Sequence, residues 1–296
     1  MSPLAHRLQR AAGWLRGTRW RRLSTTTATL GECPRWSPDG TAVYWVDIPA
    51  GRLHRTRVTD ASGRPASATD SWSLGAEIAA LTVRENGELW AWVDGTVGRF
   101  DAGMARFEPV CTMAGLDPVT HRANDGAWAP DGSLWITTMA RDGYSPTGAL
   151  VRVGMDGEAT VLCAELAIGN GPAFDGEAAL AYVVDSTRQR ILRAPLVDRP
   201  EFARFAETGT SAGHPDGIAV DSAGRLYVAH YGRAMLSVWT RDGQRLMTIP
   251  TPFPCPTAIA LRTTASGHIA LAITSAAMDG VAGGLWRCIL PPTIPR

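Results

Sequence analysis

The sequence predicts an all-β fold, a six-bladed β-propeller, on three observations. A short segment with a central glycine recurs six times, each copy is followed by strand-like runs, and helical periodicity is almost absent. The intervals between successive markers are 47, 45, 44, 48 and 43 residues, the markers being Gly40, Gly87, Gly132, Gly176, Gly224 and Gly267. Units of roughly 40 to 50 residues with about four strands each are typical of a propeller.

Each marker glycine lies in a turn before a run of β-branched, aromatic or other apolar residues, as half-buried strands require. In chain order the six turn-and-strand segments are WSPDGTAVYWVD (36–47), VRENGELWAWVD (83–94), WAPDGSLWITTM (128–139), FDGEAALAYVVD (174–185), VDSAGRLYVAHY (220–231) and RTTASGHIALAIT (262–274). A further strand-like run follows in every unit, the six being GRLHRTRV, GTVGRFD, GALVRVG, QRILRAPL, MLSVWTRDG and GLWRCIL.

A ring of blades must close, because an open blade would leave a strand edge and an apolar face in water. The β-prone segment RRLSTTTATL (21–30) precedes the first marker, so we expect this N-terminal strand to pair with GLWRCIL (284–290) in the last blade. Residues 21–296 are thus predicted to form one six-bladed propeller domain. Residues 1–20 are arginine-rich and lack acids, and we interpret them as a poorly ordered basic tail rather than a transit peptide.

Composition narrows the class of partner. Hydrophobic residues make up 45% and charged residues 19% of the chain, and the formal net charge is +1, which gives no reason to expect a nucleic acid or a membrane as partner. The five cysteines are scattered and form no CxxC pair, so neither a disulfide framework nor a thiolate zinc site is indicated. We expect a cytoplasmic protein, a monomer or weak homodimer.

Polar residues recur where the innermost strands begin. Four such stretches, about one per blade, are GECP (31–34), RANDG (122–126), GNGP (169–172) and HPDG (214–217). Equivalent loop ends meet at one mouth of a propeller, so Glu32, Asn124, Asn170 and Asp216 are expected to converge. Their oxygen donors suit Ca²⁺, Mg²⁺ or Mn²⁺, and Zn²⁺ stays possible. The competing interpretation is that all four are ordinary turn formers.

An ordered set of short motifs resembles a known family. LGECP, YWVDI, RANDG with the later TTM, GNGPAF, VVDS and HPDGIAVDSAGRLYVAHYG together resemble the SMP-30/gluconolactonase/LRE family, which includes regucalcin and bacterial sugar lactonases. The resemblance covers about residues 28 to 290. It implies a six-bladed propeller with one divalent metal cation in the central channel, in agreement with the repeat count.

Residue by residue, the resemblance implies that Glu32, Asn170 and Asp216 ligate the metal. Asn124 would lie beside the metal and Arg122 would reach hydroxyl or carbonyl oxygens of the substrate, so both are predicted to bind substrate. HRANDGAW (121–128) would then serve as a turn and as the lip of the site.

Further polar residues are assigned supporting roles. Asp125 is expected to shape its loop, and Asp185, at the end of VVDS, either supports the site from behind or is purely structural. His214 and His230 lie near the same rim and are expected to form loop hydrogen bonds.

The sequence departs from the family pattern at three places. Cys33 replaces the common Ser or Gly next to a predicted ligand, and we expect a small packed side chain there. Pro172 replaces a bulkier apolar residue, which should alter pocket shape. Segment 141–149, RDGYSPTGA, is short for the lid loop of some relatives.

These features predict a metal-dependent lactonase that opens a sugar lactone to the aldonic acid. A water polarised by the metal would attack the lactone carbonyl, with Asp216 as general base. No GxSxG elbow suggests a serine nucleophile. Two alternatives stay open, a promiscuous metal-dependent esterase or phosphotriesterase, and a non-catalytic binding propeller.

Overall fold

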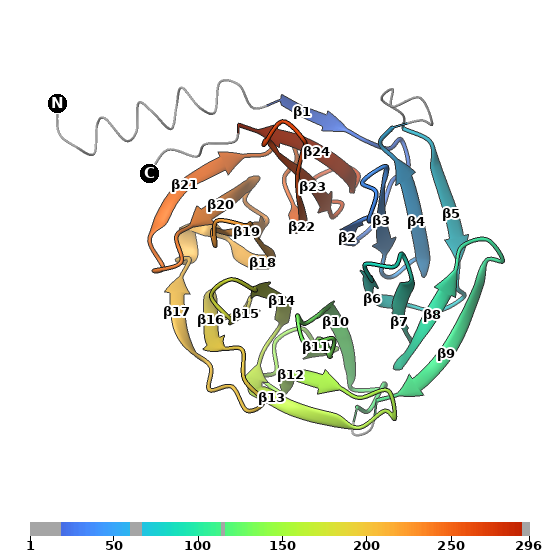
Figure 1. Ribbon diagram of the computed structural model, residues 1–296, viewed down its shortest axis with the longest axis vertical. Coiled ribbons are helices and arrows are strands. Elements are labelled where there is room, and N and C mark those ends of the chain that lie inside the picture. The colour runs from blue at the N-terminus through green and yellow to red at the C-terminus, as the bar shows by residue number, and fades with distance from the viewer. Residues whose placement is uncertain (1–18, 60–66, 114–115, 292–296) are drawn as a thin grey trace.

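The computed structural model describes residues 19–59, 67–113 and 116–291, which form six four-stranded antiparallel sheets arranged in a ring (Figure 1). The predicted six-bladed propeller is confirmed. Within the described residues the helical content is one short 3-10 turn, η1 (Thr210–Ala212), and no helix there has the length and apolar character to cross a membrane.

Every blade runs from an inner strand beside the axis to an outer strand at the rim. Blade 1 contains β2 (Gly31–Trp36), β3 (Ala42–Asp47), β4 (Arg52–Arg57) and β5 (Thr69–Ser73). Blade 2 contains β6 (Ile78–Val83), β7 (Leu89–Val93), β8 (Thr96–Asp101) and β9 (Arg106–Thr112). Blade 3 contains β10 (His121–Trp128), β11 (Leu134–Ala140), β12 (Gly148–Val153) and β13 (Ala159–Leu166).

The second half of the ring repeats this plan. Blade 4 contains β14 (Gly169–Asp175), β15 (Leu180–Asp185), β16 (Arg190–Pro195) and β17 (Ala203–Glu207). Blade 5 contains β18 (His214–Val220), β19 (Leu226–Tyr231), β20 (Met235–Trp239) and β21 (Arg245–Pro250). Blade 6 contains β22 (Pro256–Thr263), β23 (Ile269–Ser275), β24 (Gly284–Leu290) and, as its outer strand, β1 (Arg19–Arg22).

The ring is closed by β1, which pairs antiparallel with β24, as predicted (Figure 1). The strand is shorter than the expected segment 21–30 and starts at Arg19. After Arg22 the chain leaves the outer edge, and Leu30 bridges Ala276 just before β2 enters the inner position. Residues 23–30 therefore cross the end of the blade instead of extending its outer strand. Most of the predicted tail, residues 1–18, lies outside the described residues.

The marker glycines explain the regular turns between the first and second strands. Five of the six adopt positive φ, between 69° and 87°, a region that side chains disfavour. These five are Gly40, Gly87, Gly132, Gly224 and Gly267. The sequence repeat therefore marks a backbone requirement, and it places each inner strand at the same depth in its blade.

Aromatic side chains join neighbouring blades. Trp90 of β7 meets Trp128 of β10 edge to face, with ring centroids 5.4 Å apart, and Trp135 of β11 meets Phe174 of β14 at 5.2 Å. Such pairs add about 0.5–1.5 kcal/mol each beyond the area they bury. They fix the spacing of the blades, and thereby the distances between side chains that face the axis.

Candidate metal and substrate site

All six inner strands share one irregularity, at the level where the predicted ligands lie. Pairing of β2 with β3 shifts register after Glu32, that of β14 with β15 after Asn170, and that of β18 with β19 around Asp216. The shifts in β6, β10 and β22 occupy the equivalent places. A bulge turns a side chain out of the regular alternation. Six bulges therefore form a ring of re-aimed side chains around the channel.

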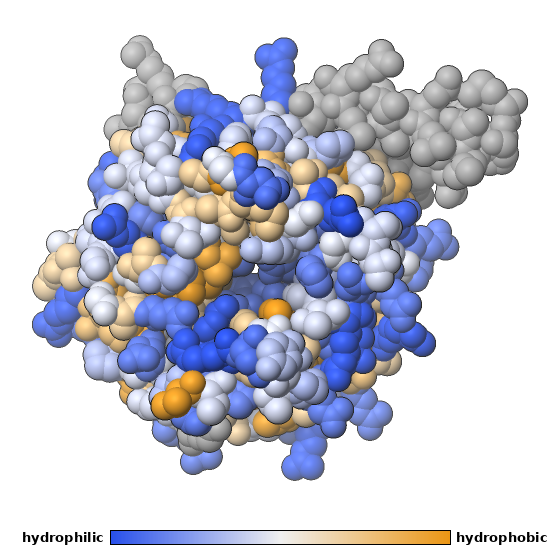
Figure 2. All heavy atoms as spheres, turned by 180° about the vertical axis from the view of Figure 1, so that it is seen from behind, coloured by the Kyte–Doolittle hydropathy of each residue, from blue (hydrophilic) through white to orange (hydrophobic). Residues whose placement is uncertain are grey.

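The structure brings the five predicted binding residues into one cavity of about 330 Å³. Its wall includes Glu32, Arg122, Asn124, Asn170 and Asp216, which come from four different blades. Ser186, His214 and Tyr231 also line it, as does Gly143 alone of the short segment 141–149. The face of the molecule seen from behind is hollowed at its centre, with hydrophilic side chains below and to the right of the hollow and apolar ones to its left (Figure 2).

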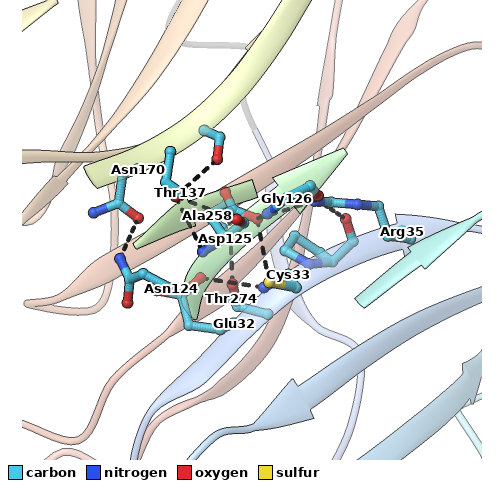
Figure 3. Close-up of polar contacts among 12 residues, drawn as sticks. Glu32, Cys33, Arg35, Asn124, Asp125, Gly126, Thr137, Asn170, Ala258 and Thr274 are labelled. Carbon is cyan, nitrogen blue, oxygen red and sulfur yellow. Dashed lines mark hydrogen bonds and ion pairs between the residues drawn. The ribbon is translucent and has the colours of Figure 1, made fainter. Parts of the chain in front are cut away.

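The two asparagines are held by direct hydrogen bonds. Asn124 Nδ2 donates to Asn170 Oδ1 at 3.0 Å and to the Gly169 carbonyl at 2.9 Å, as Figure 3 shows for the amide pair. Asn170 Nδ2 donates in turn to Ser186 Oγ at 2.9 Å. Asn170 Oδ1 accepts one hydrogen bond, from Asn124, and an amide oxygen has two lone pairs, so one lone pair remains for a further partner. Ser186 was not predicted as a site residue, although it follows Asp185 in the VVDS motif.

Two carboxylates are buried at the cavity wall, Glu32 with 6% and Asp216 with 7% of its surface exposed. Burial raises the pKa of both carboxyl groups well above its ordinary value, and the charge of Asp216 raises the pKa of Glu32 further. Within the described residues neither carboxylate has an ion-pair partner within 4.0 Å. The positive charge of Arg122 lowers the pKa of both carboxyl groups and so offsets part of each rise.

Arg122 lies beside an acid from the neighbouring blade 2, Glu77. Its Nε lies 4.0 Å from Glu77 Oε1, and Glu77 also receives a 2.9 Å contact from Arg141 Nη1. Burial lowers the pKa of the Arg122 guanidinium, but arginine stays protonated at neutral pH. Glu77 was missed by the sequence analysis because no motif surrounds it.

Asp125 is buried and does not line the cavity. Its Oδ1 accepts from Arg35 Nη2 at 3.1 Å, from Cys33 Sγ at 3.3 Å and from its own neighbour Gly126 N at 2.8 Å (Figure 3). Cys33 is fully buried with φ of 50°, and its N–H donates to Glu32 Oε2 at 3.1 Å. Asp125 thus contacts the segment of β2 that follows Glu32.

Asp185 is also behind the cavity wall. It is fully buried, accepts from Arg188 and Arg190 at 3.1 and 3.0 Å, and accepts from the backbone N–H of Ala167 at 3.3 Å. In blade 1 the Asp47 carboxylate likewise accepts hydrogen bonds from the backbone N–H groups of Thr29 and Leu30. Asp185 therefore anchors the strand end next to Ser186 rather than facing a ligand.

The remaining expectations have mixed outcomes. His214 lines the cavity and its Nδ1–H donates to the Ser186 carbonyl at 3.2 Å. His230 is buried inside blade 5, where its Nε2 pairs with Ser237 Oγ at 2.7 Å, so the expected place at the rim is wrong. Pro172 does not line this cavity but the one at the other end of the channel.

The donor set fits a hard divalent cation. Two buried carboxylates without an ion pair lie beside the oxygen of Asn170, and a cation between them would remove the cost of burying like charges. Within residues 19–59, 67–113 and 116–291 no three His, Cys, Asp or Glu side chains cluster as metal ligands. A site here would therefore combine carboxylates with an amide oxygen, which Ca²⁺ accepts.

The sequence matches the model of the SMP-30/gluconolactonase/LRE-like region over residues 30–277. The chain belongs to this family. The 6-deoxy-6-sulfogluconolactonase of Pseudomonas putida is 32% identical over 240 residues, which cover 79% of each chain. A pentonolactonase of Haloferax volcanii is 31% identical over 245 residues, 81% of this chain and 79% of that protein.

A solved structure shares the arrangement of the whole ring. The calcium-binding protein regucalcin from Agrobacterium tumefaciens superimposes with a TM-score of 0.80 at 25% identity, covering 92% of this chain and 93% of that one. The resemblance predicted from the motifs is thus confirmed for the family and for the fold.

Proposed function

We propose that this member of the family hydrolyses a sugar lactone, with one divalent cation bound by Glu32, Asn170 and Asp216. The observation that carries the proposal is the convergence of these donors with Arg122 and Asn124 on one cavity of about 330 Å³. Its relatives named as lactonases act on sugar lactones, which match a small cavity lined by hydrogen-bonding side chains.

The cation would most simply be Ca²⁺, because the donors are all oxygen and the regucalcin of Agrobacterium tumefaciens is described as calcium-binding. When bound, such a cation polarises the lactone carbonyl and makes a water molecule more acidic. The protein residues account for the remaining requirements of the reaction, namely orientation, charge stabilisation and proton transfer.

Asp216 is proposed to accept the proton from the attacking water on its carboxylate and return it to the ring oxygen as the ester C–O bond breaks. Water adds to the carbonyl carbon, so the products are the aldonic acid carboxylate and one released proton. The N–H groups of Arg122 would donate to the oxygen that gains negative charge, an effect worth roughly 3–4 kcal/mol per donor in other enzymes. Asn124 would hold a sugar hydroxyl.

The positions of the supporting residues agree with this division of labour. Glu77 lies beside the Arg122 guanidinium at the cavity wall, and Ser186 holds the Asn170 amide nitrogen, so that the amide oxygen would be free to bind the ion. Removing Glu77 should therefore raise KM or lower kcat without removing the cation, whereas removing a ligand should abolish both binding and turnover.

The test is a pH-indicator assay on chelator-stripped protein with glucono-1,5-lactone, arabinono-1,4-lactone and a paraoxon-type ester, each corrected for spontaneous hydrolysis. We expect lactone opening that returns on addition of Ca²⁺ or another divalent ion. Glu32→Gln and Asp216→Asn should lose both the bound ion and turnover, and Arg122→Gln should lose on the order of 10²-fold in kcat/KM. Asp131→Asn, in an exposed turn, is the matched control.

Three outcomes would contradict the proposal. Turnover of the paraoxon-type ester above that of every lactone would indicate the esterase alternative. Unchanged metal content in Glu32→Gln would remove the cation from this site. Absence of any hydrolysis in metal-loaded wild-type protein would favour a binding propeller.

A further inference from the structure

The channel has a second, larger cavity at its other end, of about 850 Å³. It shares no lining residue with the site cavity, because four inner strands (β2, β10, β14 and β18) contribute their first half to one mouth and their second half to the other. In β10, Asn124 faces the first cavity and Trp128 the second. The buried Cys33 and Asp125 lie between the two mouths.

The floor of this second cavity is formed by Arg35, whose charge is already neutralised. Its Nη2 contacts Asp125 at 3.1 Å and the Gly126 carbonyl at 2.8 Å, and its Nη1 donates to the Pro34 carbonyl at 2.9 Å. Arg35 therefore links blades 1 and 3 across the axis. Three of its five N–H donors are thereby used within the protein.

The wall of the second cavity carries another arginine, Arg84, which differs from Arg35 in having no ion pair within the described residues. The guanidinium of Arg84 lies 3.9 Å from the ring centre of Trp128 and 5.4 Å from that of Trp90. Among the described residues it forms no ion pair, and its buried Nε has no hydrogen-bond partner. The indole nitrogens of Trp90 and Trp128 are likewise buried without an acceptor.

Stacking uses the face of a guanidinium and leaves its N–H edge available, and a carboxylate matches that edge with two parallel hydrogen bonds. Glu85 is the one acid among the lining residues, and it is exposed and forms no ion pair with Arg84 in the described part of the chain. The buried Nε and the two indole nitrogens are out of reach of a ligand, so the donors left for an acceptor from outside the chain are the terminal Nη groups of Arg84.

The rest of the lining is largely apolar. Phe174, Ile218, Val220 and Ile259 come from three further blades and face the same space. Its volume falls in the range of about 300–1,000 Å³ that small-molecule sites occupy. A ligand here would present one anionic end to Arg84 and an apolar body to these side chains.

We propose that the second cavity binds an amphipathic carboxylate, with the carboxylate on the N–H edge of Arg84 and the apolar chain against Ile218 and Ile259. The site is separate from the lactone site, so the proposal stands whether or not the proposed hydrolysis is found.

The test is isothermal titration calorimetry of the full chain with octanoate, and with octanamide and acetate as matched probes that lack the charge or the apolar chain. We expect saturable binding of octanoate with one site per chain, and at least tenfold weaker binding of both other probes. Arg84→Gln should weaken octanoate binding at least tenfold. Asp216→Asn, at the other mouth, should bind octanoate like the wild type.

Location is checked separately by soaking crystals of the wild type with 8-bromooctanoate and recording the anomalous signal of bromine. Bromine signal beside Ile218 and Ile259, where the apolar end is placed, supports the proposal even if Arg84→Gln does not fold. Lack of saturable octanoate binding, equal binding of octanamide, folded Arg84→Gln with unchanged affinity, or bromine found elsewhere would overturn it.

Discussion

Replacing Asp216 by Asn should stabilise the metal-free protein while it abolishes metal binding. Glu32 and Asp216 are more than nine-tenths buried and lack an ion pair in the described residues. The pKa of each is raised above its ordinary value, 4.5 and 3.8 respectively, by burial first and by neighbouring carboxylates second. In the metal-free protein their contribution to stability is thus present below the unfolded pKa, and it is lost as pH rises through the folded pKa.

The expected size follows from charge and burial. Two unit charges about 4 Å apart repel by about 4 kcal/mol at an effective dielectric of about 20. Arg122 offsets part of that repulsion for both acids, so we expect a net gain of about 1–3 kcal/mol at neutral pH from the neutral side chain. For a domain of this size that gain corresponds to a rise in Tm of roughly 2–8 °C.

The assay is thermal unfolding of wild type and Asp216→Asn at pH 7.5, in chelator and in excess Ca²⁺. In chelator the variant should unfold at the higher temperature, and the gap should close as pH falls toward 4. With Ca²⁺ at about 100 times its Kd, the wild type should gain about 2.7 kcal/mol and match or exceed the variant. An Asp216→Asn variant that is less stable than wild type in chelator would refute the reasoning.

Three further predictions concern the scaffold. Arg35→Met should cost about 3 kcal/mol in urea unfolding because it leaves the Asp125 charge buried and unpaired, and adding Asp125→Asn should recover most of it; a cost below about 0.5 kcal/mol for the single variant would contradict this. Burial lowers the pKa of His54 and His230 to about 4, so their stabilisation is full above the unfolded value of 6.5 and declines as pH falls toward 4. Each should account for about 2 kcal/mol of lost stability at pH 5, and an unchanged acid slope in His54→Gln would count against it. Trp20→Ala should lower stability by about 2 kcal/mol because the Trp20 ring of β1 packs edge to face on Phe253 at 5.5 Å, whereas no change would show that this strand closes the ring weakly.

The fold could be predicted because the requirement for positive φ leaves a glycine at five of six equivalent turns. The strands that follow these turns could be predicted from their composition, since the runs GALVRVG and GLWRCIL correspond to β12 and β24. The closing strand was placed less well. RRLSTTTATL has β propensity throughout, but residues 23–30 connect the outer strand β1 to the inner strand β2. Strand propensity says nothing about the distance that a connecting segment must span.

The predicted members of the site converge because equivalent positions in a ring face one point. What the sequence could not supply was the register between blades. Glu77 meets Arg122 and Ser186 meets Asn170 only after the blades are assembled, and neither contact has a spacing in the chain that identifies it. His230 was misplaced for a related reason: alternation along β19 turns it into blade 5, one residue before Tyr231, which does line the cavity.

The most direct test of the central claim is an anomalous diffraction map of crystals grown with Ca²⁺ or Mn²⁺. The account predicts one ion per chain, about 2.3–2.6 Å from carboxylate oxygens of Glu32 and Asp216 and from Asn170 Oδ1 for Ca²⁺. An ion bound at any other place, or a fully loaded protein without an ion touching these three residues, would contradict it.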